Sequence, residues 1–339
     1  MQVSNLRSAV VISILQDDAL AVPADVLVLK YAQELYGVDA KVAWRLNTSG
    51  AGGLPEVSLP LPGSVALVDS RGLIGAPKVM FVGVVPLGQF GYEDIRSFAT
   101  RALAELADKM PDAAEIALTL HGVGFGLDET EAFRAELAGI VEALQNGKHP
   151  RELRRIVIVA KDPGLAQRLQ KQLDEIFPNE HAMRTLKHRA TALESDALRT
   201  AGKASRDKAH VFVAMPFAKE FDDRFHYGIH TAIRNAGFLC ERADMASFTG
   251  DILLWVKERI DTAELLVADL SGANANVYLE VGYAWGRGLP TVLLASNEKD
   301  LLFDVRSQRC LVYQDSIRKL EELLTQELST LAGKRRINS

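Results

Sequence analysis

The sequence predicts an α/β protein with two domains, each built on a largely parallel sheet. Short apolar runs typical of strands alternate with amphipathic helical stretches from one end of the chain to the other, which is the pattern of α/β architecture. The length of 339 residues fits about two domains. Hydrophobic residues make up 48% of the chain and charged residues 24%. These shares are ordinary for globular proteins and exclude a disordered, collagen-like or coiled-coil protein.

The strands and helices follow from the spacing of the apolar residues. Buried strands are predicted at 9–13, 25–30, 65–70, 78–85, 115–120, 155–160, 210–215, 265–270 and 291–296. Helices are predicted at 92–109, 129–145, 163–176, 222–236, 250–261 and 276–287. Because a helix follows most strands, neighbouring strands are expected to run parallel.

The predicted domains are residues 1–180 and 208–330, joined by a linker at 181–207. The join is chosen because residues 181–210 hold seven Lys/Arg against three Asp/Glu and no long apolar run. Such a charge excess is more typical of a solvated connector than of a phosphate-binding patch.

Composition and charge restrict the partners and the compartment. The net charge of −5 provides no basic field, so we expect no nucleic-acid partner. No apolar stretch approaches the roughly 20 residues of a membrane helix, and no leader peptide is expected. The two cysteines favour a reduced, cytoplasmic setting. His226 and His230 have metal-ligand spacing but lack an evident third ligand, so we expect no metal, and no cofactor is assigned.

Residues 264–288 contain the sharpest chemical pattern of the chain. A buried strand ends in Asp269, a small-residue loop follows, and a helix is predicted to begin at the N-cap Asn276. Glu280 lies off the apolar stripe of that helix and can face the carboxyl edge of the sheet. Glu280 and Asp269 are thus a candidate carboxylate pair that divides nucleophile and proton-carrier roles. The alternative is that Glu280 only complements the helix dipole and Asp269 only caps a turn.

Four segments of the second domain resemble one enzyme family: HVFVAMPF at 210–217, the step from Arg242 to Asp244, ADLSGANANVYLEVGYA at 268–284 and FDV at 303–305. They are similar to the nucleoside 2-deoxyribosyltransferase-like family, whose bacterial members overlap with Toll/interleukin-1 receptor (TIR)-like domains. The resemblance covers about residues 208–315 and implies a flavodoxin-like parallel sheet and cleavage of an N-glycosidic bond.

The resemblance also implies roles for individual residues. Glu280 falls on the family's nucleophile, and Asp269 falls on the acid that holds the sugar or protonates the leaving base. Asn274 stands where an acid is often found, which leaves hydrolysis of a ribonucleotide or of NAD open beside deoxyribosyl transfer. The expected substrate-binding residues are Met215, Pro216, Phe217, Asp244, Asn274 and Asn276.

A glycine-rich loop, HGVGFG at 121–126, joins a predicted strand to a predicted helix in the first domain. Its glycines and the helix N-terminus can present N–H groups to an anion, which predicts a diphosphate cradle. The spacing matches neither the Rossmann fingerprint nor the Walker loop. A tight strand-to-helix turn is the alternative.

The first domain resembles a macro-type domain, particularly the variant at the N-terminus of leucyl aminopeptidases. The matching segments are DVLV at 25–28, SGAGG at 49–53 and the 121–126 loop, over roughly residues 8–175. The resemblance implies a mixed sheet and binding of an ADP-ribose-like ligand, without hydrolysis because Asn47 stands alone before the first loop. The alternative is an oligomerisation scaffold. The implied ligand contacts are Asp25, Gly50, Gly52, Gly122, Val123, Gly124, Phe125 and Gly126.

Together these observations predict a signal-gated bacterial defence effector. Its first domain binds an ADP-ribose-like activator, and its second hydrolyses an N-glycosidic bond of NAD or a nucleotide. We also expect a homo-oligomer and no membrane partner. Two alternatives remain: a nucleotide-binding module without catalysis, and an ungated deoxyribosyltransferase or nucleotide salvage hydrolase.

Overall fold

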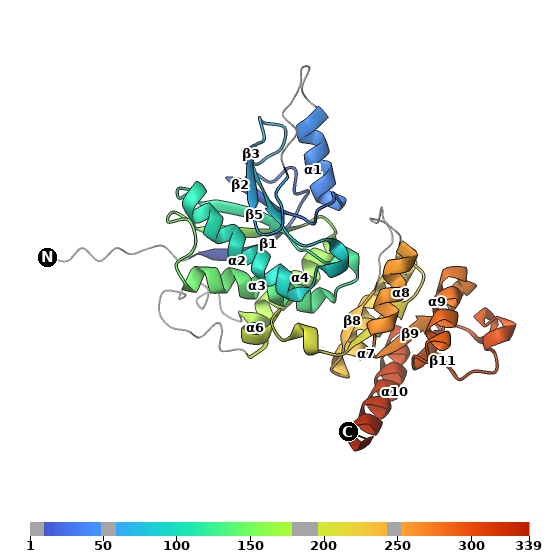
Figure 1. Cartoon of the computed structure of the whole chain (residues 1–339). Helices are drawn as coiled ribbons and strands as arrows, with labels where there is room; N and C mark the ends of the chain where they lie inside the picture. The colour runs from blue at the N-terminus through green and yellow to red at the C-terminus, as the bar shows by residue number, and fades with distance from the viewer. Residues whose placement is uncertain (1–9, 49–58, 178–195, 243–251, 339) are drawn as a thin grey trace. The chain divides into compact units, whose positions relative to one another are not determined.

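The computed structural model describes residues 10–48, 59–177, 196–242 and 252–338. The chain divides into two compact units (Figure 1). The first comprises residues 1–123 and 129–206, and the second residues 124–128 and 207–339. Within the described residues, no helix combines the length and apolarity that crossing a membrane requires.

The first unit is built on a six-stranded mixed sheet with the strand order β1-β6-β5-β2-β4-β3. All neighbouring strands pair in parallel except β3, which pairs antiparallel to β4. The strands are β1 (Val11–Gln16), β2 (Val26–Tyr31), β3 (Val65–Asp69), β4 (Lys78–Gly83), β5 (Glu115–Thr119) and β6 (Arg155–Ala160). The helices are α1 (Gly37–Thr48), α2 (Tyr92–Lys109), α3 (Glu129–Gln145), α4 (Pro163–Ile176) and α6 (Asp196–Thr200).

Helices α2 and α3 lie side by side in this unit (Figure 1). Their close approach depends on Gly139 of α3. A Cβ atom at that position would lie 2.2 Å from the carbonyl oxygen of Arg96 and 2.9 Å from the Cβ of Ala99, both in α2. The missing side chain therefore lets the two helices touch through their backbones.

Replacing Gly139 with alanine is expected to destabilise the first unit by about 2 kcal/mol, because overpacking outweighs the better helix propensity of alanine. The matched control is Gly286→Ala in α9 (Ala275–Gly286), where no heavy atom lies within 4 Å of the new Cβ. That change should be neutral or stabilising by up to about 1 kcal/mol. Thermal unfolding would measure both changes, and hydrogen exchange of α2 and α3 peptides, with α9 peptides for the control, would locate each effect. Equal effects of the two substitutions would contradict the overpacking argument.

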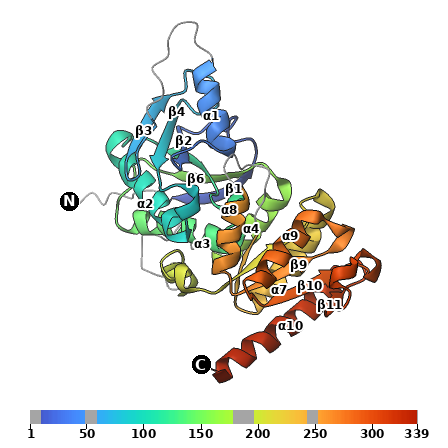
Figure 2. The same cartoon turned by 45° about the vertical axis from the view of Figure 1, so that its right-hand side comes forward.

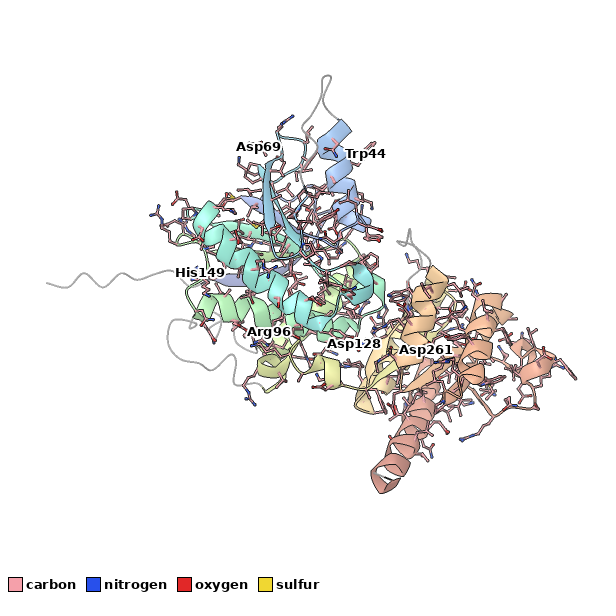
Figure 3. The ribbon with its side chains drawn as sticks, in the orientation of Figure 1. Trp44, Asp69, Arg96, Asp128, His149 and Asp261 are labelled. Carbon is pink, nitrogen blue, oxygen red and sulfur yellow. The ribbon has the colours of Figure 1, made fainter. Side chains whose placement is uncertain are left out.

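The segment from α6 to residue 206 belongs to the first unit, although the sequence analysis placed it in the linker. Arg96 of α2, which is 5% exposed (Figure 3), accounts for this. Its guanidinium donates to the carbonyl oxygens of Leu198, Arg199 and Ala201 and to the carboxylate of Glu142. One buried cation thus bonds carbonyl oxygens at and just after the end of α6, which ties this segment to α2.

The second unit is built on a five-stranded sheet with the order β11-β10-β9-β7-β8, in which all neighbouring pairs are parallel. Read from β7 as the first strand, this is the 2-1-3-4-5 order of flavodoxin-like folds. The strands are β7 (His210–Ala214), β8 (Leu239–Glu241), β9 (Leu265–Asp269), β10 (Thr291–Ala295) and β11 (Cys310–Val312). The principal helices are α7 (His230–Asn235), α8 (Ile252–Thr262), α9 (Ala275–Gly286) and α10 (Ile317–Asn338). The predicted fold class, two α/β domains with a mixed and then a parallel sheet, is confirmed.

Each face of this second sheet packs on its own pair of helices (Figure 2). Leu265 and Val267 of β9 face a core that includes residues of α7 and α10. Leu266 and Ala268 face a core that includes residues of α8 and α9. This alternation, which follows from the two-residue period of a strand, decides which site residues can meet.

Candidate functional site

A pocket of about 320 Å³ lies in the second unit, between α8 and α9. It is lined mainly by apolar and aromatic side chains with a single carboxylate, that of Glu280. The lining residues are Leu253, Val256, Lys257, Ile260, Tyr278, Leu279, Glu280, Gly282 and Tyr283. Concave, mostly apolar pockets with a few polar groups are the usual form of small-molecule sites.

The carboxyl group of Glu280 is strongly perturbed by this environment. Burial raises its pKa from the ordinary 4.5 to about 7. The shift arises because the apolar surroundings penalise the charged form. A carboxyl with a pKa near neutrality inside a pocket is a candidate for acid–base or nucleophilic chemistry.

One wall of the pocket is held by a polar cluster at the ends of α8 and α9. Tyr283 donates its hydroxyl hydrogen to the carboxylate of Asp261, with oxygen–oxygen distances of 3.1 and 3.0 Å. Arg287 donates from Nε to the same carboxylate at 2.7 Å. The ammonium of Lys257 lies 5.5 Å from the centre of the Tyr283 ring. These contacts fix the position of the Tyr283 ring in the pocket wall.

The raised pKa of Glu280 predicts a pH-dependent stability. Since the folded protein holds this proton more tightly than the unfolded chain, native stability is lost as the pH rises from about 4.5 to about 7. Glu280→Gln removes that loss, so its advantage over the native protein should grow by up to about 1.4 kcal/mol per pH unit in this window. Chemical unfolding at several pH values would measure it. A stability difference between Glu280→Gln and the native protein that stays constant from about pH 4.5 to about pH 7 would contradict the raised pKa of Glu280.

Strand parity directs Asp269 to the opposite face of the sheet from α9, and the lining of the Glu280 pocket does not include Asp269. As an odd position of β9, Asp269 faces the α7 and α10 side, whereas α9 packs on the opposite face. Its carboxylate is fully buried and accepts hydrogen bonds from the Ser271 hydroxyl at 2.6 Å and the Tyr313 hydroxyl at 3.0 Å. Burial raises the Asp269 pKa, and the Ser271 and Tyr313 bonds oppose that shift. The pairing of Asp269 with Glu280 stays a prediction that strand parity does not favour.

The predicted substrate loop follows β7 at the carboxyl edge of the same sheet. Met215 and Pro216 are buried, and Phe217 is exposed. Arg242, which follows β8, joins them: its guanidinium carbon lies 6.0 Å from the Phe217 ring centre and 3.9 Å from that of Phe225. The sequence analysis noted Arg242 only as part of a motif, because its stacking depends on the adjacency of β7 and β8. Asp244 lies outside the described residues.

The cap of α9 is Asn274 and not Asn276. Asn274 has extended backbone angles (φ −67°, ψ 121°), and its side-chain oxygen accepts the N–H of Asn276 at 3.0 Å. Asn276 lies inside the helix and is exposed. The N-cap prediction was therefore displaced by two residues, and the Asn274 side chain serves the helix start.

Asp25 of the first unit lies at the amino edge of its sheet. It directly precedes β2, and its carboxylate accepts the N–H groups of Ala114 and Glu115 at the start of β5 at 2.7 and 2.9 Å. The 121–126 loop follows the end of β5, at the carboxyl edge. These two predicted parts of one ligand site are therefore separated by the length of a strand, and Asp25 has a structural role.

The remaining predicted contacts of the first domain lie on the two glycine loops. Gly50 and Gly52 fall outside the described residues.

Gly122 and Gly126 have φ angles of +89° and +91°, and Val123–Phe125 form one 3₁₀ turn between them. A Cβ at Gly126 would lie 2.4 Å from the Trp255 ring, within the second unit to which residues 124–128 belong. Gly126 is thus required for packing as well as for backbone conformation.

A buried polar cluster near the carboxyl edge of the first sheet was not predicted. Lys30 and Asp39 form an ion pair at 2.8 Å with side-chain exposures of 4% and 1%. Burial raises the Asp39 pKa, and Lys30 partly offsets this. Burial lowers the pKa of the nearby His121, assisted by the charge of Lys30. Only the fold brings β2, α1 and the end of β5 together, so spacing in the sequence gives no signal for this cluster.

Among the described residues, no group of three or more histidine, cysteine or acidic side chains is arranged to hold a metal ion. His226 lies in a π-helical turn, Arg224–Ile229, and His230 begins α7. Their rings contact Phe225, with ring centres 4.9 and 5.9 Å from its own.

No protein-family model matches the sequence, and comparison with curated proteins finds no match. Over about half its length the chain is similar to solved macrodomain structures. A single-residue variant of the Oceanobacillus iheyensis macrodomain is 16% identical, with a TM-score of 0.37 and coverage of 49% of this chain and 92% of that chain. The Trypanosoma brucei macrodomain in complex with ADP is 16% identical, with a TM-score of 0.36 and coverage of 48% and 68%. The bottromycin maturation enzyme BotP is 14% identical over 90% of this chain and 89% of its own, with a TM-score of 0.29.

Proposed function

We propose that the second unit hydrolyses the N-glycosidic bond of NAD or a nucleotide, and that an ADP-ribose-like nucleotide bound to the first unit controls this activity. The observation that supports the proposal is the single carboxyl group of Glu280, half-buried in an apolar pocket of about 320 Å³ with its pKa raised to about 7. Such a group is stabilised most by a ligand that brings positive charge to it.

The chemistry of N-glycosidic cleavage develops positive charge on the sugar. As the bond between C1′ and the base nitrogen breaks, its electron pair leaves with the base and C1′ becomes oxocarbenium-like. The ionised Glu280 is destabilised by about 3 kcal/mol through burial. Positive charge that develops on C1′ relieves that penalty in the transition state more than the intact bond does in the ground state, which is the condition for catalysis.

The pocket lining contains one carboxyl group, that of Glu280, and this number indicates which leaving group the site can accommodate. A neutral purine needs a proton as it departs, whereas the nicotinamide of NAD already carries a positive charge and leaves neutral. Asp269 faces the other side of the sheet, so the described pocket lining provides one carboxyl group for one role. Glu280 stabilises C1′, and water then adds its hydroxide to C1′ while its remaining proton passes to Glu280 or solvent. We therefore place NAD ahead of neutral nucleosides as the substrate.

For the first unit, we assign the ligand to the carboxyl edge of the mixed sheet. Gly122 and Val123 follow β5 there, and the turn at Gly122 can direct backbone N–H groups towards a diphosphate. The ligand class comes from the sequence resemblance to macro-type domains. Control of the second unit requires that this ligand bind the resting and active states with different affinity. A role in antiphage defence rests on analogy, because the pairing of a nucleotide sensor with a glycosidase-like domain resembles bacterial antiphage systems.

A nucleotide-binding module without catalysis is the second candidate. It is favoured by the position of Asp269, whose oxygens are already occupied by Ser271 and Tyr313. In this case Glu280 would recognise a cationic or hydrogen-bonding ligand without reaction.

The test is a substrate screen on the full-length protein. NAD, NADP, ATP and a panel of nucleosides are incubated with and without ADP-ribose, and released base is quantified by chromatography with Glu280→Gln as the blank. Glu280-dependent release of nicotinamide that increases with ADP-ribose is expected. Release that is equal with and without ADP-ribose would overturn the control by the first unit. Binding of NAD without release would favour the second candidate.

A further inference from the structure

Phe303 is held in a conspicuously exposed position on the second unit. Its side chain is 85% exposed, the largest fraction for any large apolar residue in the described part of the chain. Its neighbours Leu301 and Val305 are only 8% and 3% exposed and belong to the core beneath α8 and α9. Because Leu301 and Val305 are both packed in the core, the backbone between them is held in place and the Phe303 side chain is kept exposed to solvent.

The segment around Phe303 is also tied to the wall of the Glu280 pocket. The hydroxyl group of Tyr278 accepts the N–H of Leu302 at 3.1 Å and donates to the carbonyl oxygen of Asp300 at 3.2 Å. Tyr278 lines the pocket together with Glu280. Phe303 is thus one residue from a backbone group that is bonded to the pocket wall.

The polarity of this region indicates what the ring could contact. The pocket lining includes two tyrosines, Tyr278 and Tyr283, and only two charged side chains, Glu280 and Lys257. A large exposed aromatic ring whose neighbour Leu302 is bonded to Tyr278 of the pocket wall favours a planar aromatic ligand, since stacking covers the ring and tolerates different ring types. A sugar or phosphate alone would gain little from it.

We propose that Phe303 is the base-stacking residue of this site, on which the departing aromatic base lies while C1′ of the ribose faces Glu280. The proposal rests on the function proposed above and adds a specificity-determining residue to it. Because Phe303 is exposed and makes no core contact that its substitution would remove, its variants are expected to fold as the native protein does.

Binding is tested without catalysis, in the full-length Glu280→Gln protein carrying Phe303→Trp. The added tryptophan fluorescence should be quenched on titration with NAD and with nicotinamide, and should not respond to the ring-free probe ribose 5-phosphate. Tyr227→Trp is the matched control, since Tyr227 is another aromatic residue of this unit and is 50% exposed. Quenching of both reporters alike, or of neither, would overturn the proposal.

Kinetics provide the second readout. Phe303→Ala is expected to raise KM for NAD about 10- to 100-fold, which corresponds to the loss of one base–aromatic stack. Phe303→Tyr should restore most of the loss, whereas Phe303→Leu, which is apolar but not aromatic, should not. Equal rescue by leucine, or a change of oligomeric state in Phe303→Ala without a change in KM, would show that the ring is an apolar contact and not a stacking surface.

The two proposals fail in different ways. If NAD quenches the Phe303→Trp reporter but the native protein releases no base, the stacking role of Phe303 is supported and the proposed hydrolysis is wrong. If base is released and Phe303→Ala has native KM and kcat, the reaction stands and the stacking role is wrong.

Discussion

Glu280→Gln is expected to lower the rate of base release from NAD by about a hundred- to a thousandfold, as the loss of one preorganised electrostatic contact with a developing charge does elsewhere. Glutamine retains the shape of the side chain but cannot carry the negative charge that the oxocarbenium-like C1′ requires. Glu280→Asp should retain part of the activity, because the charge remains and only its reach shortens. The control is Glu258→Gln on the neighbouring helix α8, which should have native activity.

The pH profile separates the two roles that Glu280 could play. If the ionised form acts, the rate for NAD rises as the pH increases through about 7 and then levels off, since the pKa of Glu280 is about 7. If the protonated form donates to a neutral base, the rate falls over the same range. Base release measured from about pH 5.5 to about pH 8.5, which brackets that pKa, decides between them. A flat profile, or native activity of Glu280→Gln, would exclude Glu280 from the reaction.

Lys30→Met is expected to destabilise the first unit by about 3–5 kcal/mol, because it leaves Asp39 buried without its cation. The loss should be smaller at low pH, where Asp39 is protonated and neutral. Since burial already raises the Asp39 pKa against the attraction of Lys30, removing Lys30 should extend the pH range in which the neutral form persists. Hydrogen exchange of β2 and α1 peptides, together with thermal unfolding, would measure both effects.

The double variant Lys30→Met with Asp39→Leu is the control for this prediction. Replacing both members of a buried ion pair by apolar side chains is often neutral, so the double variant should recover most of the stability. The two sites are in direct contact at 2.8 Å, and their effects should therefore be strongly non-additive. Additive losses would show that Lys30 and Asp39 stabilise the unit through separate contacts.

Elements with strong periodicity could be predicted from the sequence almost to the residue. Helices α2, α3 and α4 have the predicted bounds 92–109, 129–145 and 163–176. Their apolar residues recur with a helical period because each packs one face on its unit. The short edge strands β8 and β11, three residues each, were missed because so short a run has no period to detect.

The helices α1 and α10 were also absent from the predicted elements. Helix α1 begins at Gly37 and carries charged and polar side chains on much of its surface, while α10 is predominantly polar outside its few buried leucines. Leu320, Leu324 and Leu328 of α10 are fully buried with a spacing of four residues. That spacing is a helical signal already present in the sequence of the C-terminal region.

The residues of the candidate site likewise fall into those that could be predicted from the sequence and those that could not. The motif around Glu280 could be found in the sequence, since local spacing places that residue off the apolar stripe of its helix. The separation of Glu280 from Asp269 could not, because it depends on which face of β9 each side chain meets. The position of Asp25 could not be predicted either, because its place before an apolar strand does not indicate that the ligand loop lies at the opposite edge of the sheet.

What the sequence by itself determined is therefore the α/β class, the two-domain organisation and the residue types available for chemistry, because these follow from composition and from periods of two and 3.6 residues. Only the tertiary structure decided which of those residues share a pocket. The perturbed pKa of Glu280 arises from side chains of two helices, and the Lys30–Asp39 pair from a strand and the helix after it. Desolvation is a property of packed surroundings, and no local pattern in the chain encodes it.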